Sequence, residues 1–291
     1  MIRKNLFVAA IGFVLFVAPA YGQKKQAKKS RMVETMKVKN VLEPAPYGSI
    51  HFGGYLGDKM DLCINNGLMA QDIDRLVKPF REKPDENWGF RSEFWGKWYT
   101  SAVWGYGYAP TPENRAVIDR AVRELMATQD ANVYIGTYLD ENHLGDWDVW
   151  GRKYVMLGLL AYYEKAREAK VLEVALKVAD HLIKEAGPES GVNIAATGWI
   201  GWKGLPSSSV LEPIALLYQI TGEKRYLDFG EHIIKMWESP NVYSPTGLHL
   251  IEQALGGTPM WEMGGSPKAY EMTSCFEGLC EMYRITGNEL Y

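Results

Sequence analysis

Four carboxylates lie close together in one stretch of the chain, at Asp140, Glu141, Asp146 and Asp148. Glycosidases usually work with two carboxylates, of which one protonates the leaving group and the other attacks or activates water. Acidic residues at the start of a helix also serve as solvated caps. The spacing therefore has two interpretations, a catalytic or binding cluster and a set of helix caps.

Glu271 and Cys275 are four residues apart, so a helix would place them on one face, where they could bind a metal ion. The other interpretation, a buried free thiol, suits all three cysteines, Cys63, Cys275 and Cys280, which do not make a disulfide framework. His181 and His232 fall within expected helices, as packing or surface residues. The sequence contains no H-E-x-x-H, G-x-S-x-G, phosphate-loop or dinucleotide motif. We therefore assign no metal ligand and no catalytic residue from motifs.

Composition excludes several classes of protein. The 291 residues carry a net charge of −3, with 47% hydrophobic and 23% charged residues, as in an ordinary globular protein. No basic stripe suggests a nucleic-acid partner. The chain is rich in aromatic residues, with 10 Trp and 17 Tyr, and many of them fall in glycine-rich loops. Aromatic side chains in loops suit a binding surface, although core packing also accounts for some of them.

The N-terminus has the pattern of an export signal. Arg3 and Lys4 precede an apolar run over 6–19, and the small residues Ala20 and Gly22 suit signal-peptidase cleavage. We expect residues 1–22 to be a signal peptide and the protein to be periplasmic or extracellular, without a membrane span after cleavage. Residues 23–90 then form a basic spacer and an irregular segment that wraps around the rest.

A repeat organises the remainder, 91–291. The segments LLYQITGEKRY (216–226) and EMYRITGNELY (281–291) each run from a helix through Thr-Gly into charged residues and an aromatic. Glycine ends the first helix in the left-handed conformation, so each copy indicates a helical hairpin. Apolar periodicity predicts helices over 92–106, 113–128, 149–166, 168–186, 207–220, 223–237 and 268–285. The fold class is all-α, an array of antiparallel hairpins of which about four are present.

The connections between these helices are of two kinds. Those within a hairpin are short, whereas 129–147, 187–206 and 238–267 are long. In an antiparallel array, all the long connections emerge at the same end. Long loops in a compact domain are usually functional, so we expect the binding site at that end.

The segments EFWGKWYTSAV, WDVWGRKYVMLGLLAYYE, LPSSSVLEPIALLYQITGEKRYLDFGEHII and KAYEMTSCFEGLCEMYRITG, in this order, resemble glycoside hydrolase family 127. The resemblance implies an incomplete (α/α)6 barrel and a β-L-arabinofuranosidase-like hydrolase. The family's acid/base glutamate and zinc-bound cysteine nucleophile would lie beyond Tyr291. We therefore expect a longer protein whose full length could hold zinc, while 1–291 alone is inactive and binds no cofactor.

The chain departs from the family at the sugar pocket. Family histidines there correspond to Trp147, Tyr154, Ser207 and Lys268, and a family glutamate corresponds to Asp148. The resemblance thus implies substrate binding by a set of seven residues, and Arg152, Lys153 and Lys268 replace neutral or weakly basic family residues. The seven are Trp147, Asp148, Trp150, Arg152, Tyr154, Ser207 and Lys268. If Asp148 binds substrate, Asp148→Asn would impair kinetics with little loss of stability.

The expected function is an exported glycoside hydrolase that removes a terminal sugar from a plant-type oligo- or polysaccharide. The sugar would be arabinofuranose-like, or acidic in view of the added cations. Two alternatives stay open: an unsaturated-uronide hydrolase or lyase on the same barrel, and a non-catalytic glycan-binding protein.

Overall fold

The computed structural model describes residues 36–84, 91–199, 201, 204–263 and 268–291. The expected signal peptide and basic spacer lie outside these residues. The described part is helical, and its one β-bridge joins Gly145 to Gly198. The all-α prediction is confirmed. No helix among the described residues is long and apolar enough to cross a membrane.

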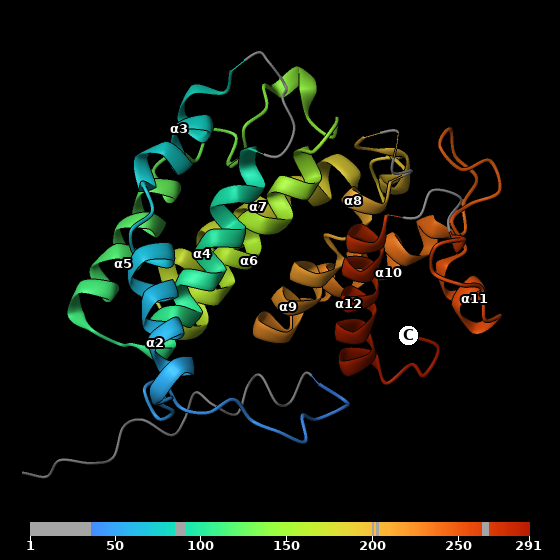
Figure 1. The fold of residues 1–291 in the computed structure, drawn as a ribbon. Coiled ribbons are helices and arrows are strands. Elements are labelled where there is room, and N and C mark those ends of the chain that lie inside the picture. Colours follow the sequence, from blue (N-terminus) through green and yellow to red (C-terminus); the bar gives the residue numbers. More distant parts are fainter. Residues whose placement is uncertain (1–35, 85–90, 200, 202–203, 264–267) are drawn as a thin grey trace, which may run out of the picture.

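Among the described residues, three hairpins and one further long helix form the body (Figure 1). The hairpins pair α4 (Arg91–Tyr108) with α5 (Pro112–Met126), α6 (Asp148–Ala166) with α7 (Ala169–Ala186), and α9 (Leu211–Thr221) with α10 (Lys224–Trp237). The further helix is α12 (Ala269–Thr286). Short elements lie between them: η2 (Asp140–Asn142), η3 (Ile194–Ala196), α8 (Leu205–Ser208) and α11 (Leu250–Leu255).

The long helices form an inner and an outer layer. Among the inner helices, α4 packs on α6, α6 on α8 and α9, and α9 on α12. Helix α6 is buried around much of its circumference, as an inner helix must be. The outer helix α7 buries a stripe at helical spacing, including Val171, Val174, Val178 and Leu182, and faces water on its other side.

The two Thr-Gly turns have the same geometry, as predicted from the repeat. Gly222 and Gly287 take φ of 70° and 67°, in the left-handed region that favours glycine. Each donates its N–H to the tyrosine carbonyl four residues earlier, at 2.7 Å. Each preceding threonine accepts, through Oγ1, the N–H two residues on, at 3.1 Å. The same local sequence therefore closes both turns in the same way.

The long connections meet at one end of the array, as expected. Gly198 N–H donates to the Leu144 carbonyl at 2.9 Å, which joins the loop before α6 to the loop after α7. Tyr243, in the loop after α10, donates its hydroxyl to the Gly198 carbonyl at 3.4 Å. Thr111 caps α5 with Pro112 at its start, also as predicted.

Two expectations are wrong. Residues 23–90 are not uniformly irregular, because α2 (Gly54–Leu62), the π-helix η1 (Cys63–Leu68) and α3 (Ile73–Glu82) lie there. Burial of Ile73, Val77 and Phe80 stabilises α3. Its apolar pattern is too short to predict a helix by itself. The helix expected over 207–220 is broken into α8 and α9. Pro213 has no N–H for the Ser209 carbonyl, which explains the break.

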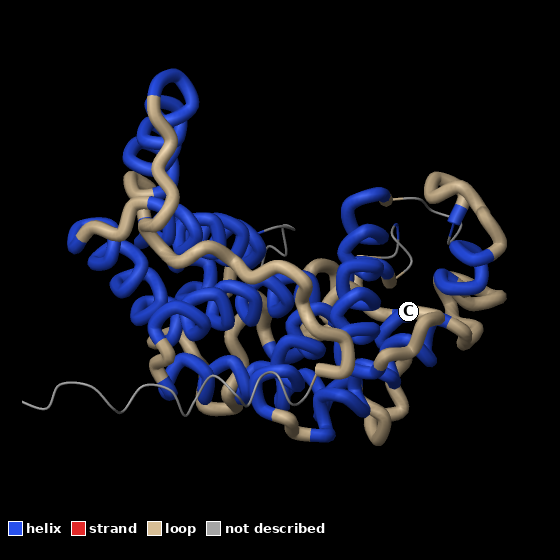
Figure 2. The backbone as a smooth tube through the Cα atoms, turned by 90° about the horizontal axis from the view of Figure 1, so that it is seen from below, coloured by secondary structure: helices blue, strands red, loops and turns tan. Residues whose placement is uncertain are grey.

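Residues 36–52 do wrap around the helices, as expected, and we call this segment the strap. It crosses the end of the array where the Thr-Gly turns lie (Figures 1 and 2). Lys37 and Val38 donate their N–H groups to the Arg284 carbonyl near the end of α12, at 2.9 and 3.0 Å. Gly48 donates to the Gly107 carbonyl near the end of α4, at 2.7 Å. The strap thus ties the last inner helix to the first.

Candidate functional site

The start of α6 is held by an unusual loop. Val133, Leu144 and Asp146, none of them glycine, take positive φ of 71°, 63° and 39°. Non-glycine residues adopt such backbone angles only when surrounding contacts hold them, and they often cluster near functional sites. The loop places Trp147 and Asp148 at the loop-rich end.

Asp148 and Arg152 form a buried ion pair one turn apart on α6. The Arg152 guanidinium donates to both Asp148 carboxylate oxygens, at 3.1 and 2.5 Å. Asp148 also accepts from the Tyr134 hydroxyl at 2.7 Å and from the Leu144 N–H at 2.9 Å. Both charged side chains are fully buried. Burial opposes the charge of Arg152, but the pairing with Asp148 raises its pKa above the ordinary value.

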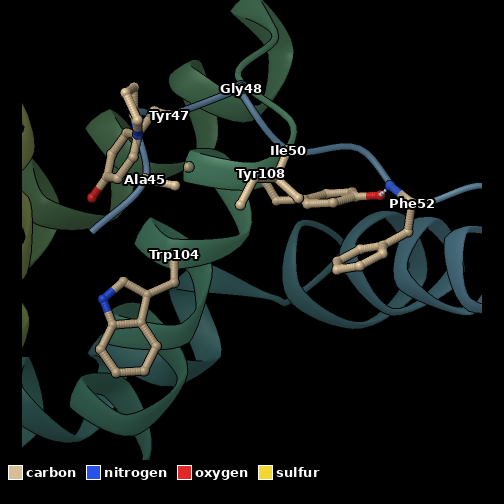
Figure 3. Close-up of a pocket in the computed structure, with 9 residues that line it drawn as sticks. Ala45, Tyr47, Gly48, Ile50, Phe52, Trp104 and Tyr108 are labelled. Atoms are coloured by element: carbon tan, nitrogen blue, oxygen red, sulfur yellow. Dashed lines mark hydrogen bonds between the residues drawn. The ribbon is translucent and has the colours of Figure 1, made fainter. Parts of the chain in front are cut away.

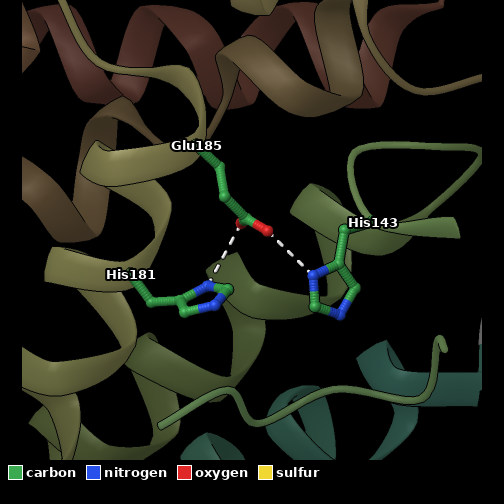
Figure 4. Close-up of side chains that lie close together, drawn as sticks. All are labelled: His143, His181 and Glu185. Carbon is green, nitrogen blue, oxygen red and sulfur yellow. Dashed lines mark hydrogen bonds and ion pairs between the residues drawn. The ribbon is translucent and has the colours of Figure 1, made fainter. Parts of the chain in front are cut away.

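Glu185 of α7 extends this pair. It accepts from Arg152, and its carboxylate lies 2.8 Å from His143 Nδ1 and 3.1 Å from His181 Nδ1 (Figure 4). Burial alone would raise the pKa of Glu185, but these histidine and arginine contacts hold it well below the usual value. Glu185 is therefore a carboxylate at neutral pH. The sequence interpretation of His181 as an ordinary packing residue missed this cluster.

A second group of side chains surrounds Lys97 of α4, and we call Lys97, Trp150, Tyr154 and Tyr270 the aromatic–lysine cluster. Lys97 Nζ lies 5.4, 4.9 and 4.6 Å from the ring centroids of Trp150, Tyr154 and Tyr270. The hydroxyls of Tyr154 and Tyr270 are 2.6 Å apart. Three helices, α4, α6 and α12, thus contribute to one cluster. Its accessible face consists of Tyr270, which is 47% exposed, and the partly exposed Lys97.

Carboxylates line the buried side of the aromatic–lysine cluster. Glu93 accepts from the Trp150 indole N–H and pairs with Lys97 at 3.0 Å. Glu271 lies 3.5 Å from Lys268, and its second oxygen is buried without a hydrogen-bond partner. Burial raises the pKa of Glu271.

Four described cations near this site are paired with carboxylates. Lys153 pairs with Glu212 at 3.2 Å, and both are largely buried. Together with Lys97–Glu93, Lys268–Glu271 and Arg152–Asp148, four ion pairs surround the start of α6 and of α12. Such pairing cancels the positive field that the sequence suggests, which removes the main argument for an acidic sugar.

The structure places the seven sequence-predicted residues in related but different surroundings. Trp147, Trp150 and Tyr154 pack in one aromatic group with Tyr134 and Tyr138. Asp148 and Arg152 neutralise each other beneath it. Ser207 is buried on α8, where a Cβ added to Gly198 would lie 2.6 Å from its Oγ. Lys268 is the N-cap residue of α12, two residues before Tyr270. Their role in substrate binding stays a prediction.

Sequence reasoning missed Glu93, Lys97 and Tyr270 as members of the candidate site, and it considered Glu271 only as a possible metal ligand beside Cys275. Glu93 and Lys97 are four apart, a spacing typical of ion pairs on a helix. That signal was present in the sequence, but it does not distinguish a site from a solvated helix face.

The metal site that the Glu271–Cys275 spacing allows is not favoured by the surroundings of the described cysteines. Cys63 and Cys280 are exposed and Cys275 is buried. Burial raises the pKa of the Cys275 thiol to about 12, which disfavours the thiolate form that binds a metal ion. Among described residues, the groups of three potential metal ligands contain histidine and glutamate but no cysteine.

The fold defines a protein of the helical-hairpin, α/α-barrel type. Its sequence identifies the family. The family model described as "Beta-L-arabinofuranosidase, GH127 catalytic domain" matches residues 55–257, so the chain belongs to glycoside hydrolase family 127. The non-reducing end β-L-arabinofuranosidase of Bifidobacterium longum subsp. longum is 29% identical over 161 residues, 51% of this chain and 23% of the relative.

Solved structures agree on the fold. The GH127 β-L-arabinofuranosidase from Geobacillus stearothermophilus T6 matches with a TM-score of 0.60 at 15% identity, covering 83% of this chain and 43% of that one. A second GH127 β-arabinofuranosidase matches with a TM-score of 0.57 at 16% identity, covering 85% and 41%. The chain therefore spans less than half the length of these relatives.

Proposed function

We propose that this chain supplies sugar-binding groups of an exported glycoside hydrolase that acts on the terminal arabinofuranose-like sugar of a plant-type glycan. The single observation that carries the proposal, beside the family, is the aromatic–lysine cluster at the loop-rich end. Sugar-binding sites combine aromatic faces, which cover the apolar face of a sugar ring, with a few polar groups that fix its hydroxyls. Tyr270 and Lys97 offer both to a ligand.

The cluster suits a neutral sugar better than an acidic one. Lys97 is already paired with Glu93, and Lys268 with Glu271. A bound carboxylate would compete with these glutamates, whereas sugar hydroxyls can donate to them and accept from the lysines. We assign binding and orientation to this cluster and no catalytic role. Zinc and export remain part of the proposal through the family resemblance and the N-terminal pattern.

The test measures ligand binding to the 291-residue chain by calorimetry and by tryptophan fluorescence. Trp150 contributes to the fluorescence signal. Methyl L-arabinofuranoside and galacturonate serve as the neutral and acidic probes. We expect the neutral probe to bind more tightly, and Tyr270→Ala and Lys97→Met to weaken binding at least tenfold, about 1.4 kcal/mol.

Trp104→Ala is the matched control, because Trp104 is an exposed aromatic of α4 outside the cluster. If Trp104→Ala weakens binding as much as Tyr270→Ala does, the cluster is not the site. Tighter binding of galacturonate would favour the alternative of a uronide-processing enzyme. Neutral-sugar binding by a longer form that hydrolyses no arabinofuranoside would favour a non-catalytic glycan-binding protein.

A further inference from the structure

His143, His181 and Glu185 form a compact group of potential metal ligands, which we call the His–Glu cluster (Figure 4). One ligand atom from each lies within 4.8 Å of the others. His181 and Glu185 are one turn apart on α7, and His143 follows η2 in the loop before α6. The cluster therefore joins two elements that are otherwise far apart in sequence.

The His–Glu cluster is well shielded from water. The side chains of His143, His181 and Glu185 are 7%, 12% and 21% exposed. The His143 ring also packs against the Tyr134 ring, with centroids 4.1 Å apart. Ligands in such a position are held in place before an ion arrives, which favours binding.

The carboxylates of the cluster outnumber its guanidinium. Asp148 and Glu185 bring two negative charges, and Arg152, bonded to both, brings one positive charge. These three groups together carry one excess negative charge, which a cation bound beside them can offset. An uncompensated buried charge is costly, so the surroundings favour binding of a positive species.

His181 Nδ1 cannot satisfy both of its neighbours. It lies 3.3 Å from Arg152 Nη1, which can only donate, and 3.1 Å from a Glu185 oxygen, which can only accept. If Nδ1 carries no proton, its lone pair faces the lone pairs of the Glu185 oxygen. A cation shared by the nitrogen and the carboxylate removes this conflict.

We propose that the His–Glu cluster binds a single first-row divalent transition-metal ion, with zinc as the ion best suited to two imidazoles and one carboxylate. His143 and His181 would bind through Nδ1 and Glu185 through its carboxylate. Arg152 keeps its two bonds to Asp148 and orients Glu185. His143 Nε2 faces Asp140 Oδ1 at 3.7 Å, and a carboxylate behind a ligating histidine is a common support of metal sites.

This site is different from the thiolate zinc site implied by the resemblance, since no cysteine takes part. It also differs from a second group, Glu238, His249 and Glu252. There His249 Nδ1 lies 2.6 Å from Glu238, and its Nε2 bonds to the Thr246 carbonyl at 2.5 Å. Both nitrogens thus face acceptors, and the Thr246 bond with the two glutamates raises the pKa of His249. The side chains of His249, Glu238 and Glu252 are 33%, 47% and 78% exposed, much more than those of the His–Glu cluster, so His249 is a control.

The ion would link the loop before α6 to α7 and so stabilise the fold. We expect the chelator-treated 291-residue chain to bind one Zn²⁺ in calorimetry, with a rise in thermal midpoint that EDTA reverses. Co²⁺ should give visible d–d absorption without the near-ultraviolet band of a cobalt–thiolate bond. His143→Gln and His181→Gln should weaken Zn²⁺ binding roughly 100-fold or more, and His249→Gln should not.

Three results would each overturn the proposal. The first is a wild-type chain that shows neither Zn²⁺ binding nor a thermal shift, and the second is wild-type affinity in both histidine variants. The third is a cobalt–thiolate band, which would place the ion on cysteine. The thermal shift is measured on the wild-type chain, so it decides the question even if a variant does not fold. Far-ultraviolet circular dichroism shows which variants are folded.

Discussion

Asp148 is fixed from three directions, by Tyr134, by the Leu144 N–H and by Arg152. A buried carboxylate with this many donors stabilises the fold. Its partner Arg152 has no contact with solvent, and the carboxylates of Asp148 and Glu185 neutralise its charge. The residue that sequence suggests as a substrate ligand is therefore also a stabilising centre.

We expect Asp148→Asn to destabilise the fold by about 3 kcal/mol, because the amide keeps only one of the two oxygens that accept from Arg152, Tyr134 and the Leu144 N–H, and so leaves buried donors without a partner. Urea unfolding followed by circular dichroism measures the difference. Asp146→Asn is the matched control, since Asp146 lies in the same loop and asparagine tolerates its positive φ. Wild-type stability with weakened sugar binding would instead support the direct binding role that sequence suggests for Asp148.

Glu271 gives a pH-dependent prediction. Its pKa is raised in the folded state, mainly by burial, so its ionisation opposes folding. Stability attributable to this group is present at low pH and is lost as the pH rises through the folded-state pKa. Glu271→Gln should therefore gain stability relative to the wild type as the pH increases above the ordinary glutamate range.

The measurement is the thermal midpoint of both proteins at a series of pH values, with the exposed Glu289→Gln as a control for removal of one carboxylate. The difference between Glu271→Gln and the wild type should grow with pH. A difference that shrinks with rising pH would mean that the ion pair with Lys268 outweighs burial.

At the scale of elements, α4 and α6 approach closely because small residues face each other. A Cβ placed on Gly151 would lie 1.8 Å from Ser92 Oγ, and one placed on Gly96 would lie 2.2 Å from the Tyr154 carbonyl oxygen. This contact sets the position of Trp150 and Tyr154 beside Lys97. The aromatic–lysine cluster thus depends on the spacing of two inner helices.

Gly151→Ala should lower stability by about 2 kcal/mol or more, because the added methyl group overlaps Ser92. Chemical denaturation is the measurement, and Gly67→Ala is the control, since nothing lies within 4 Å of a Cβ there. The double variant Ser92→Gly/Gly151→Ala should recover part of the loss. Equal effects of the two single alanine variants would show that helix spacing is not the cause.

At the scale of the whole molecule, the strap connects the ends of α12 and α4. It also borders a pocket of about 300 Å³ next to the end of α4, lined by Tyr47, Ile50, Phe52, Trp104 and Tyr108 among others (Figure 3). Lys165 Nζ lies 3.7 Å from the centroid of the Tyr47 ring. Tyr108 accepts the Phe52 N–H through its hydroxyl, at 3.1 Å. The strap therefore contacts α4, α6 and α12.

Tyr47→Ala should destabilise the chain by roughly 1 kcal/mol through loss of the Lys165 contact and ring burial. Because the strap touches both helix ends, amide hydrogen exchange should accelerate at the ends of α4 and α12 together. Tyr55→Ala is the control, as Tyr55 is 73% exposed. Faster exchange confined to α4 would mean that the strap does not couple the two helices.

The sequence by itself determined the hairpins, the Thr-Gly turns and the end at which the long loops gather. These features depend on local rules: a left-handed glycine at 222 and 287, a threonine cap at 111, and apolar periodicity. Such signals act over a few residues, so they can be read without the rest of the chain.

Only the tertiary structure decided which charged groups meet. Lys97, Trp150 and Tyr270 are separated by long stretches of sequence, and so are His143 and Glu185. Their proximity follows from how closely α4, α6, α7 and α12 pack, which depends on side-chain volume at many positions at once. Burial and pairing then set the charge of the site. For this reason the cations in the sequence suggested an acidic ligand, whereas the folded chain pairs each of them with a carboxylate.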